Sequence, residues 1–90
     1  MRLDLFLKTS RLIPRRSLAQ EFCDKGLISV NGAAAKSSKE VSAGDEITIK
    51  RRSRRTVIKV NSVPQTKQVA KAAVADLYDI VSDENLPDPE

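Results

Sequence analysis

The chain has 90 residues, 31% of them charged, with no His, no Trp and one Cys, so it suits one small domain and excludes His-based catalytic triads, His-ligated metals and an internal disulfide. The formal net charge is +4, but residues 1–59 hold 14 Lys/Arg against 6 Asp/Glu, whereas residues 60–90 hold 2 against 6. A basic body with an acidic C-terminal segment indicates interaction with a charged partner.

Two amphipathic helices are predicted at the N-terminus. Leu3, Phe6 and Leu7 have helical spacing, which predicts a helix over roughly residues 2–9 with Leu5 turned toward solvent. After a connection at residues 10–13, a second helix is expected from Pro14 or Arg15 to about residue 25. Its apolar face consists of Leu18, Ala19, Phe22 and Cys23, and Gly26 is a favourable stop.

The next part of the chain changes to the two-residue period of β-strands. Asn31-Gly32 is a strong signal for a type I′ hairpin turn, which needs positive φ at both positions. We predict strands at residues 28–30, 33–36, 46–50 and 56–60, with a loop at residues 51–55 and the end of the sheet at Pro64.

The C-terminal third returns to helical spacing. Residues 67–81 place Ala70, Ala73, Val74, Leu77 and Val81 on one face, so a helix is predicted there, and the acidic residues after it are expected to be disordered. We therefore expect an α+β fold in which two N-terminal helices pack on a small, mostly antiparallel sheet, plus a short C-terminal helix. The predicted divisions are a domain at 1–62, a helical extension at 63–81 and a tail at 82–90.

The helical region and the segments beside it carry the first candidate binding set. Such charges are often only a solvated face, but Arg11, Arg15 and Arg16 converge where the first helix meets the second. Asp4 is the nearby acid placed to orient one of them. The full set of expected nucleic-acid contacts is Arg2, Asp4, Lys8, Arg11, Arg15, Arg16, Lys25, Lys36 and Lys39, with Asn31 in the hairpin.

Arginines in the first turn of a helix oppose its dipole, at a cost of roughly 0.3–1 kcal/mol each at an exposed site. A bound anion would offset that cost, and the planar guanidinium suits phosphate. The placement of Arg15 and Arg16 therefore favours a nucleic-acid backbone as the partner.

A second basic cluster lies in the predicted loop after the third strand. Its arginines are Arg51, Arg52, Arg54 and Arg55. A basic cluster in a hairpin loop, rather than on an amphipathic helix, is a poor membrane anchor. It is either an auxiliary phosphate contact or a solvated loop, and the sequence leaves both interpretations open.

Catalysis is not expected, because the chain has no phosphate-binding loop, no paired cysteines and no carboxylates with an evident catalytic partner. We expect no metal, no cofactor and no small-molecule substrate, and we interpret Cys23 as a core residue. Phe6 and Phe22 lie on apolar faces, so no aromatic row is left for stacking bases. A folded RNA, recognised through phosphates and shape, is favoured, although charge alone does not exclude DNA.

No apolar run is long enough to span a bilayer, and charged Arg2 and Asp4 stand at the start in place of a signal-peptide core. With the lone cysteine, this predicts a cytosolic protein that does not associate with membranes.

Four motifs together resemble the αL RNA-binding motif, also called the S-four domain, over about residues 1–60. They are R-L-D at residues 2–4, R-x-x-A at 16–19, G-x-I-x-V-N-G at 26–32 and G-D-E-I at 44–47. The acidic C-terminal segment resembles the RqcP group of ribosome-associated quality control factors more than the related fifteen-kilodalton heat-shock group, whose extension is usually basic.

This resemblance implies a partner and a role. It implies binding to large-subunit ribosomal RNA and to P-site tRNA or peptidyl-tRNA on stalled large subunits, together with an RqcH-type factor that adds C-terminal alanine tails. Arg2, Asp4, Arg11, Arg16 and Lys36 match the family pattern, whereas Leu5 and Pro14 stand where members commonly have lysine. A monomer is expected. The alternatives are a heat-shock-type factor that rescues large subunits and a protein-interaction adaptor that uses the acidic C-terminal segment.

Overall fold

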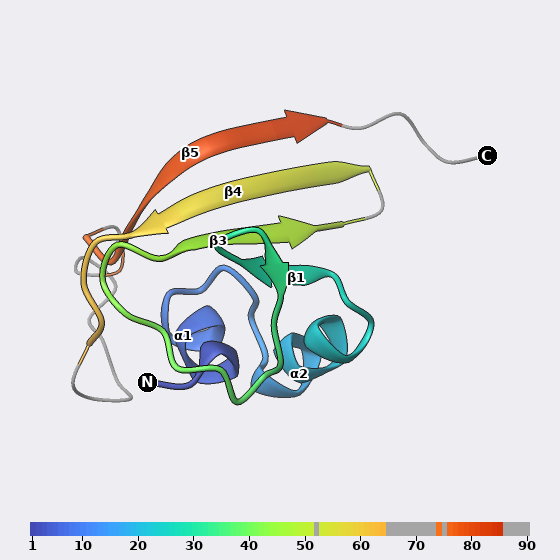
Figure 1. The fold of residues 1–90 in the computed structure, drawn as a ribbon, viewed down its shortest axis with the longest axis horizontal. Helices are drawn as coiled ribbons and strands as arrows, with labels where there is room; N and C mark the ends of the chain where they lie inside the picture. Colours follow the sequence, from blue (N-terminus) through green and yellow to red (C-terminus); the bar gives the residue numbers. More distant parts are fainter. Residues whose placement is uncertain (52, 65–73, 75, 86–90) are drawn as a thin grey trace.

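The computed structural model describes residues 1–51, 53–64, 74 and 76–85. Within them the helices are α1 (Leu3–Thr9) and α2 (Arg16–Asp24), and the strands are β1 (Ile28–Val30), β2 (Ala33–Ala34), β3 (Glu46–Lys50), β4 (Arg54–Val60) and β5 (Tyr78–Asn85). The strands form one antiparallel sheet in the order β2-β1-β3-β4-β5. Both helices lie on the same side of this sheet, and β5 is the strand farthest from them (Figure 1).

The two helices form where the apolar spacing predicts them. Leu3, Phe6 and Leu7 of α1 are fully buried, whereas Leu5 is half-buried and not directed freely into solvent. The second helix begins at Arg16, because Arg15 is still extended, with φ −127° and ψ 139°. Arg15 is therefore the residue before the helix and not part of its first turn.

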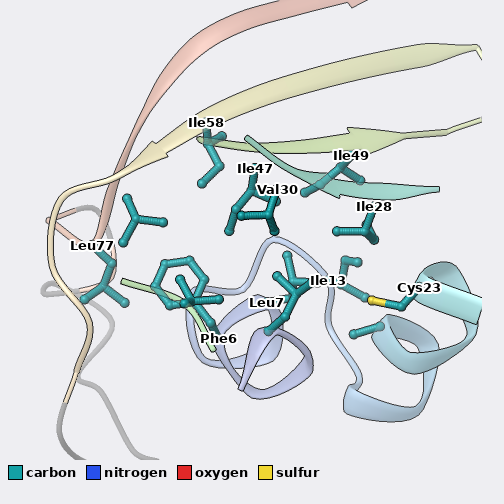
Figure 2. Packing of buried hydrophobic residues seen from close by; sticks show 14 residues of the cluster. Phe6, Leu7, Ile13, Cys23, Ile28, Val30, Ile47, Ile49, Ile58 and Leu77 are labelled. Atoms are coloured by element: carbon teal, nitrogen blue, oxygen red, sulfur yellow. The ribbon is translucent and has the colours of Figure 1, made fainter. Parts of the chain in front are cut away.

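The core lies between the helices and the sheet (Figure 2). Alternate residues of β3 and β4, Ile47, Ile49 and Ile58 among them, point toward the apolar faces of α1 and α2. Each such aliphatic side chain contributes roughly 1.5–3 kcal/mol when fully buried. Cys23 belongs to this core, as predicted, and burial raises the pKa of its thiol to about 11, so the thiol stays protonated at neutral pH.

The hairpin between β1 and β2 has the predicted geometry. Asn31 and Gly32 both have positive φ, at 53° and 85°, as a type I′ turn requires. The returning strand is shorter than expected and ends at Ala34. The amide side chain of Asn31 donates to Asp45, and its oxygen accepts the backbone N–H of Glu46, so the turn is joined to the start of β3.

The C-terminal prediction is wrong from Tyr78 onward. Residues 78–85 form β5, which pairs with β4 from Val60↔Tyr78 to Arg54↔Asn85. Residues 78–81 are therefore strand and not helix, the predicted boundary at 81/82 falls inside β5, and residues 82–85 are not a disordered tail. The rest of the predicted helix (67–73 and 75) and of the tail (86–90) lies outside the described residues.

The pairing with β5 also corrects two neighbouring predictions. Arg54 and Arg55 belong to β4 and not to a loop, because their backbone groups pair with those of residues 84 and 85. Pro64 does not end the sheet, since β5 follows it in the chain. Leu77, just before β5, is 5% exposed and packs in the main core, so this segment is part of the domain.

Candidate nucleic-acid interface

A buried carboxylate organises the junction between the two helices. The side chain of Asp4 is completely buried in the first turn of α1. Its Oδ2 accepts hydrogen bonds from Nε of Arg16 at 3.2 Å and Nε2 of Gln20 at 2.8 Å, both on α2. Its Oδ1 accepts the backbone N–H of Leu5 at 2.8 Å and lies 3.4 Å from Nε of Arg2. Asp4 therefore orients both arginines, one more than the sequence predicted.

The electrostatics of Asp4 keep it charged. Burial raises its pKa, but hydrogen bonds from Gln20, Arg16 and the Leu5 backbone together outweigh burial and hold the pKa below its ordinary value. At neutral pH one carboxylate thus faces two guanidiniums, whose side chains remain 47% exposed for Arg2 and 39% for Arg16. The group carries a net positive charge and presents N–H donors to solvent.

The segment between the helices adds two arginines, Arg11 and Arg15, which differ from Arg2 and Arg16 in having no contact with Asp4. Arg11 and Arg15 are exposed, and neither forms an ion pair with any residue that the structure describes. Arg11 has φ 62°, a conformation that costs a non-glycine residue about 1–3 kcal/mol. Strain of this kind is frequent at functional sites, and here it holds an exposed cation at the turn between α1 and α2.

The start of α2 remains open to an anion. Arg15, its N-cap, makes no capping hydrogen bond through its side chain, and no acidic residue occupies the first turn. The first N–H groups of α2 therefore have neither a capping side chain at Arg15 nor a first-turn carboxylate to accept their hydrogen bonds, although most helices are capped at this point.

The loop before β3 brings further lysines to the start of α1. The backbone N–H of Leu3 donates to the Lys39 carbonyl at 2.7 Å, and that of Asp4 donates to the Ser37 carbonyl at 3.1 Å. Lys36 and Lys39 are exposed and lie in the segment that adjoins Arg2. Lys8 is exposed in the last turn of α1.

These positions define the helix-junction surface: Arg2, Lys8, Arg11, Arg15, Arg16, Lys36 and Lys39. Asp4 joins Arg2 to Arg16, and backbone hydrogen bonds from residues 37 and 39 join the lysine loop to α1. The segment between the helices carries Arg11 and Arg15.

Two other predicted contacts are occupied within the protein. Lys25 pairs with Glu21 one turn earlier on α2, at 2.9 Å. The side chain of Asn31 is taken up by Asp45 and Glu46. Asn31 therefore shapes the hairpin, and only its backbone remains as a candidate contact.

The second basic cluster is only partly available. Arg51 donates to the Leu12 carbonyl at 2.9 Å, and Arg54 forms an ion pair with Asp83 of β5, with Nε 2.7 Å from Oδ1. Arg55 stands opposite Glu84 in the strand register, and Arg52 lies outside the described residues. Arg51 and Arg54 are thus engaged within the protein, one by the segment between the helices and the other by the acidic strand β5.

One functional neighbour was not predicted. Gln20 makes the shortest of the side-chain hydrogen bonds to Asp4. The signal was present in the sequence, because Gln20 follows Arg16 by four residues and so lies on the same face of α2. Across the described ranges, no helix has the length and apolar character to cross a bilayer, and no three metal-ligating side chains come together.

Comparison with known proteins gives consistent matches. Residues 1–47 match the S4 domain. A Bacillus subtilis protein named RQC P-site tRNA stabilizing factor is 45% identical over 86 residues, which cover 96% of this chain and 98% of that protein. A Halalkalibacterium halodurans protein of the same name is 41% identical over the full length of both chains.

Two solved structures share the fold. The structure of heat shock protein 15 from Vibrio cholerae, described as trimeric, matches with a TM-score of 0.80 and 29% identity, over 91% of this chain and 82% of that one. The solution structure of a protein described as hypothetical matches with a TM-score of 0.80 and 33% identity, over 93% and 100% of the two chains. The predicted arrangement of two helices on a mostly antiparallel sheet is confirmed.

Proposed function

The chain belongs to the S4 domain family, and on that premise we propose that it is a non-catalytic RNA-binding factor of ribosome-associated quality control. It binds the stalled large ribosomal subunit, where it contacts ribosomal RNA and stabilises the P-site tRNA or peptidyl-tRNA. It supports the addition of C-terminal alanine tails by an RqcH-type factor. The identity of 45% with a relative named for P-site tRNA stabilisation supports this role.

The helix-junction surface is the proposed RNA contact. The observation that carries it is the set of exposed cations around the buried Asp4 carboxylate, with Arg11 and Arg15 free of ion pairs among the described residues. Guanidinium forks and the N–H groups at the start of α2 suit phosphate oxygens. Recognition through phosphates and shape needs no exposed aromatic row, which agrees with the burial of Phe6.

The proposed mechanism is positional. The buried carboxylate of Asp4 holds the side chains of Arg2 and Arg16 in place, so these side chains lose little rotamer entropy when they bind phosphate. Arg11 and Arg15 add contacts at the connection, and Lys36 and Lys39 extend the surface beside α1. No step transfers a group or needs a cofactor. The protein works in the cytosol, where the ribosome is.

The test is recovery of the tagged chain from cells, followed by measurement of peptidyl-tRNA per large subunit. We expect large subunits that carry peptidyl-tRNA to be enriched over vacant subunits and free RNA. Arg15→Ala lowers recovery several-fold, whereas Lys59→Ala, which removes one exposed positive charge from β4, leaves it unchanged. Equal recovery of vacant subunits, or equal losses for both variants, would contradict the proposal.

A second candidate is a factor of the heat-shock type, which rescues large subunits carrying peptidyl-tRNA without alanine tailing. The fold match with heat shock protein 15 at a TM-score of 0.80 favours keeping it. Mass spectrometry of stalled nascent chains separates the two roles: loss of alanine tails in cells lacking this protein supports the first, and unchanged tails support the second.

A further inference from the structure

Strand β5 is the last strand in the order of the sheet. It pairs with β4 along one side, and no strand among the described residues pairs along the other. Its eight residues exceed the usual strand length of about 5–6. Long edge strands are uncommon without a cover, because their free N–H and C=O groups are a template for another chain.

The same strand carries exposed apolar side chains. Ile80 and Val81 are 59% and 56% exposed, and they are the large hydrophobic residues most open to solvent in the described part of the chain. They are consecutive in the chain and lie at a β-bulge: Ile58 pairs with Ile80 and Val57 pairs with Ser82, which leaves Val81 without a partner on β4. The edge strand thus exposes two consecutive apolar residues at the point where its regular pairing is interrupted.

Acidic residues surround this apolar pair. Asp83 is bound to Arg54 and to Thr56. Asp79 and Glu84 are exposed and stand opposite Lys59 and Arg55 of β4 in the strand register, but neither forms an ion pair within the described ranges. Proteins often protect an edge strand with charges and bulges, and that is the simpler interpretation of these features. Negative charges on the strand, however, repel acidic partners and attract basic ones.

The charges decide which partner fits. Antiparallel pairing of β5 with β5 of a second copy would bring two acidic strands together, which disfavours self-association. RNA phosphates would be repelled for the same reason. An extended segment rich in Lys and Arg is not repelled by the acidic residues of β5. The methylene groups of its Lys and Arg side chains can also cover Ile80 and Val81.

We propose that the outer edge of β5 binds an extended, basic segment of another protein as a sixth strand. Main-chain hydrogen bonds to the edge supply affinity, and contacts with Asp79, Glu84 and the apolar pair select a Lys/Arg-rich sequence. Within the sheet, β5 is the strand farthest from α1 and α2 (Figure 1). The same molecule can therefore hold RNA on its helix-junction surface and a basic protein segment on β5.

The experiment uses the full chain, labelled with ¹⁵N, and a synthetic peptide in which lysine and valine alternate. We expect amide shifts confined to β4 and β5, and no binding of peptides with glutamate for lysine or with proline at alternate positions. Asp79→Lys weakens binding about fivefold or more, the effect of losing one favourable charge contact. Asp24→Lys, the same change on the exposed end of α2, leaves binding unchanged.

Several outcomes would overturn the proposal. They are equal binding of the glutamate peptide, shifts centred on the helix-junction surface, equal weakening by Asp24→Lys and Asp79→Lys, or concentration-dependent self-association through β5. Ile80→Ser provides a second variant that keeps the charges and should also weaken binding. RNA affinity, measured on the same samples, stays unchanged in Asp79→Lys, so failure here is distinguishable from failure of the proposed RNA role.

Discussion

The Nε atom of Arg16 lies 3.2 Å from Oδ2 of Asp4, so a fully buried carboxylate of α1 holds the first residue of α2. The same arginine is thus a support of the fold and a candidate phosphate contact. A change at Arg16 alone therefore alters stability and binding together.

Arg16→Ala lowers the free energy of unfolding by about 1–2 kcal/mol, because it removes a hydrogen bond to a buried charge. Most surface changes have effects within about 0.5 kcal/mol, and Lys59→Ala is the matched control. Urea denaturation of both variants measures the difference. Equal stability of the two would show that the contact with Asp4 contributes nothing.

Acid should weaken the domain through Asp4. Its pKa in the folded state lies below the ordinary 3.8, so its stabilising contribution is present above that value and is lost as the pH falls through the folded-state pKa. Between about pH 5 and pH 2 the parent chain therefore loses more stability than Asp4→Asn, which has no such carboxyl to protonate. Parallel slopes for both chains in urea titrations would contradict this assignment.

Arg11→Gly separates strain from function. Glycine adopts φ 62° readily, so the free energy of unfolding is unchanged or rises by up to about 1 kcal/mol. Affinity for large subunits falls several-fold, because an exposed guanidinium is lost. A loss of stability that accompanies the loss of binding would indicate a structural role for the Arg11 side chain.

Leu77→Ala tests whether the C-terminal segment is part of the core. Leu77 is 5% exposed and packs in the main cluster, so its truncation costs about 2–5 kcal/mol. Ile80→Ala, at an exposed position three residues later, changes stability by less than about 0.5 kcal/mol. Similar values for the two variants in thermal or urea unfolding would refute the placement of Leu77.

Much of the fold could be predicted because local signals agree with it. The spacing of Leu3, Phe6 and Leu7, the Asn31-Gly32 turn and the alternation in β3 each specify an element without reference to the rest of the chain. The strand β5 could not be found in this way, because its bulge places Ile80 and Val81 together and breaks the alternation. Its strand state depends on pairing with β4, a contact between segments distant in sequence.

The candidate site, like the fold, could be predicted only where local sequence signals determine it. Charge and helix position were enough to predict a basic group at the junction of the helices, where the structure joins Arg2 and Arg16 through Asp4. The ion pairs were harder to foresee, because Arg54 meets Asp83 only once β5 is paired with β4, and the expected open basic loop is partly neutralised. Sequence motifs can indicate which surface a family uses for binding, but the partners of individual side chains depend on tertiary packing.

The most direct test of the central claim is the salt dependence of binding to large subunits that carry peptidyl-tRNA. If the helix-junction surface binds phosphates, log K falls linearly with log[salt], with a slope of about 0.7–0.9 for each phosphate neutralised. The double variant Arg11→Ala/Arg15→Ala should reduce that slope by about 2, and Lys59→Ala should leave it unchanged. A slope near zero in the parent chain, or one that the double variant leaves unaltered, would contradict the account.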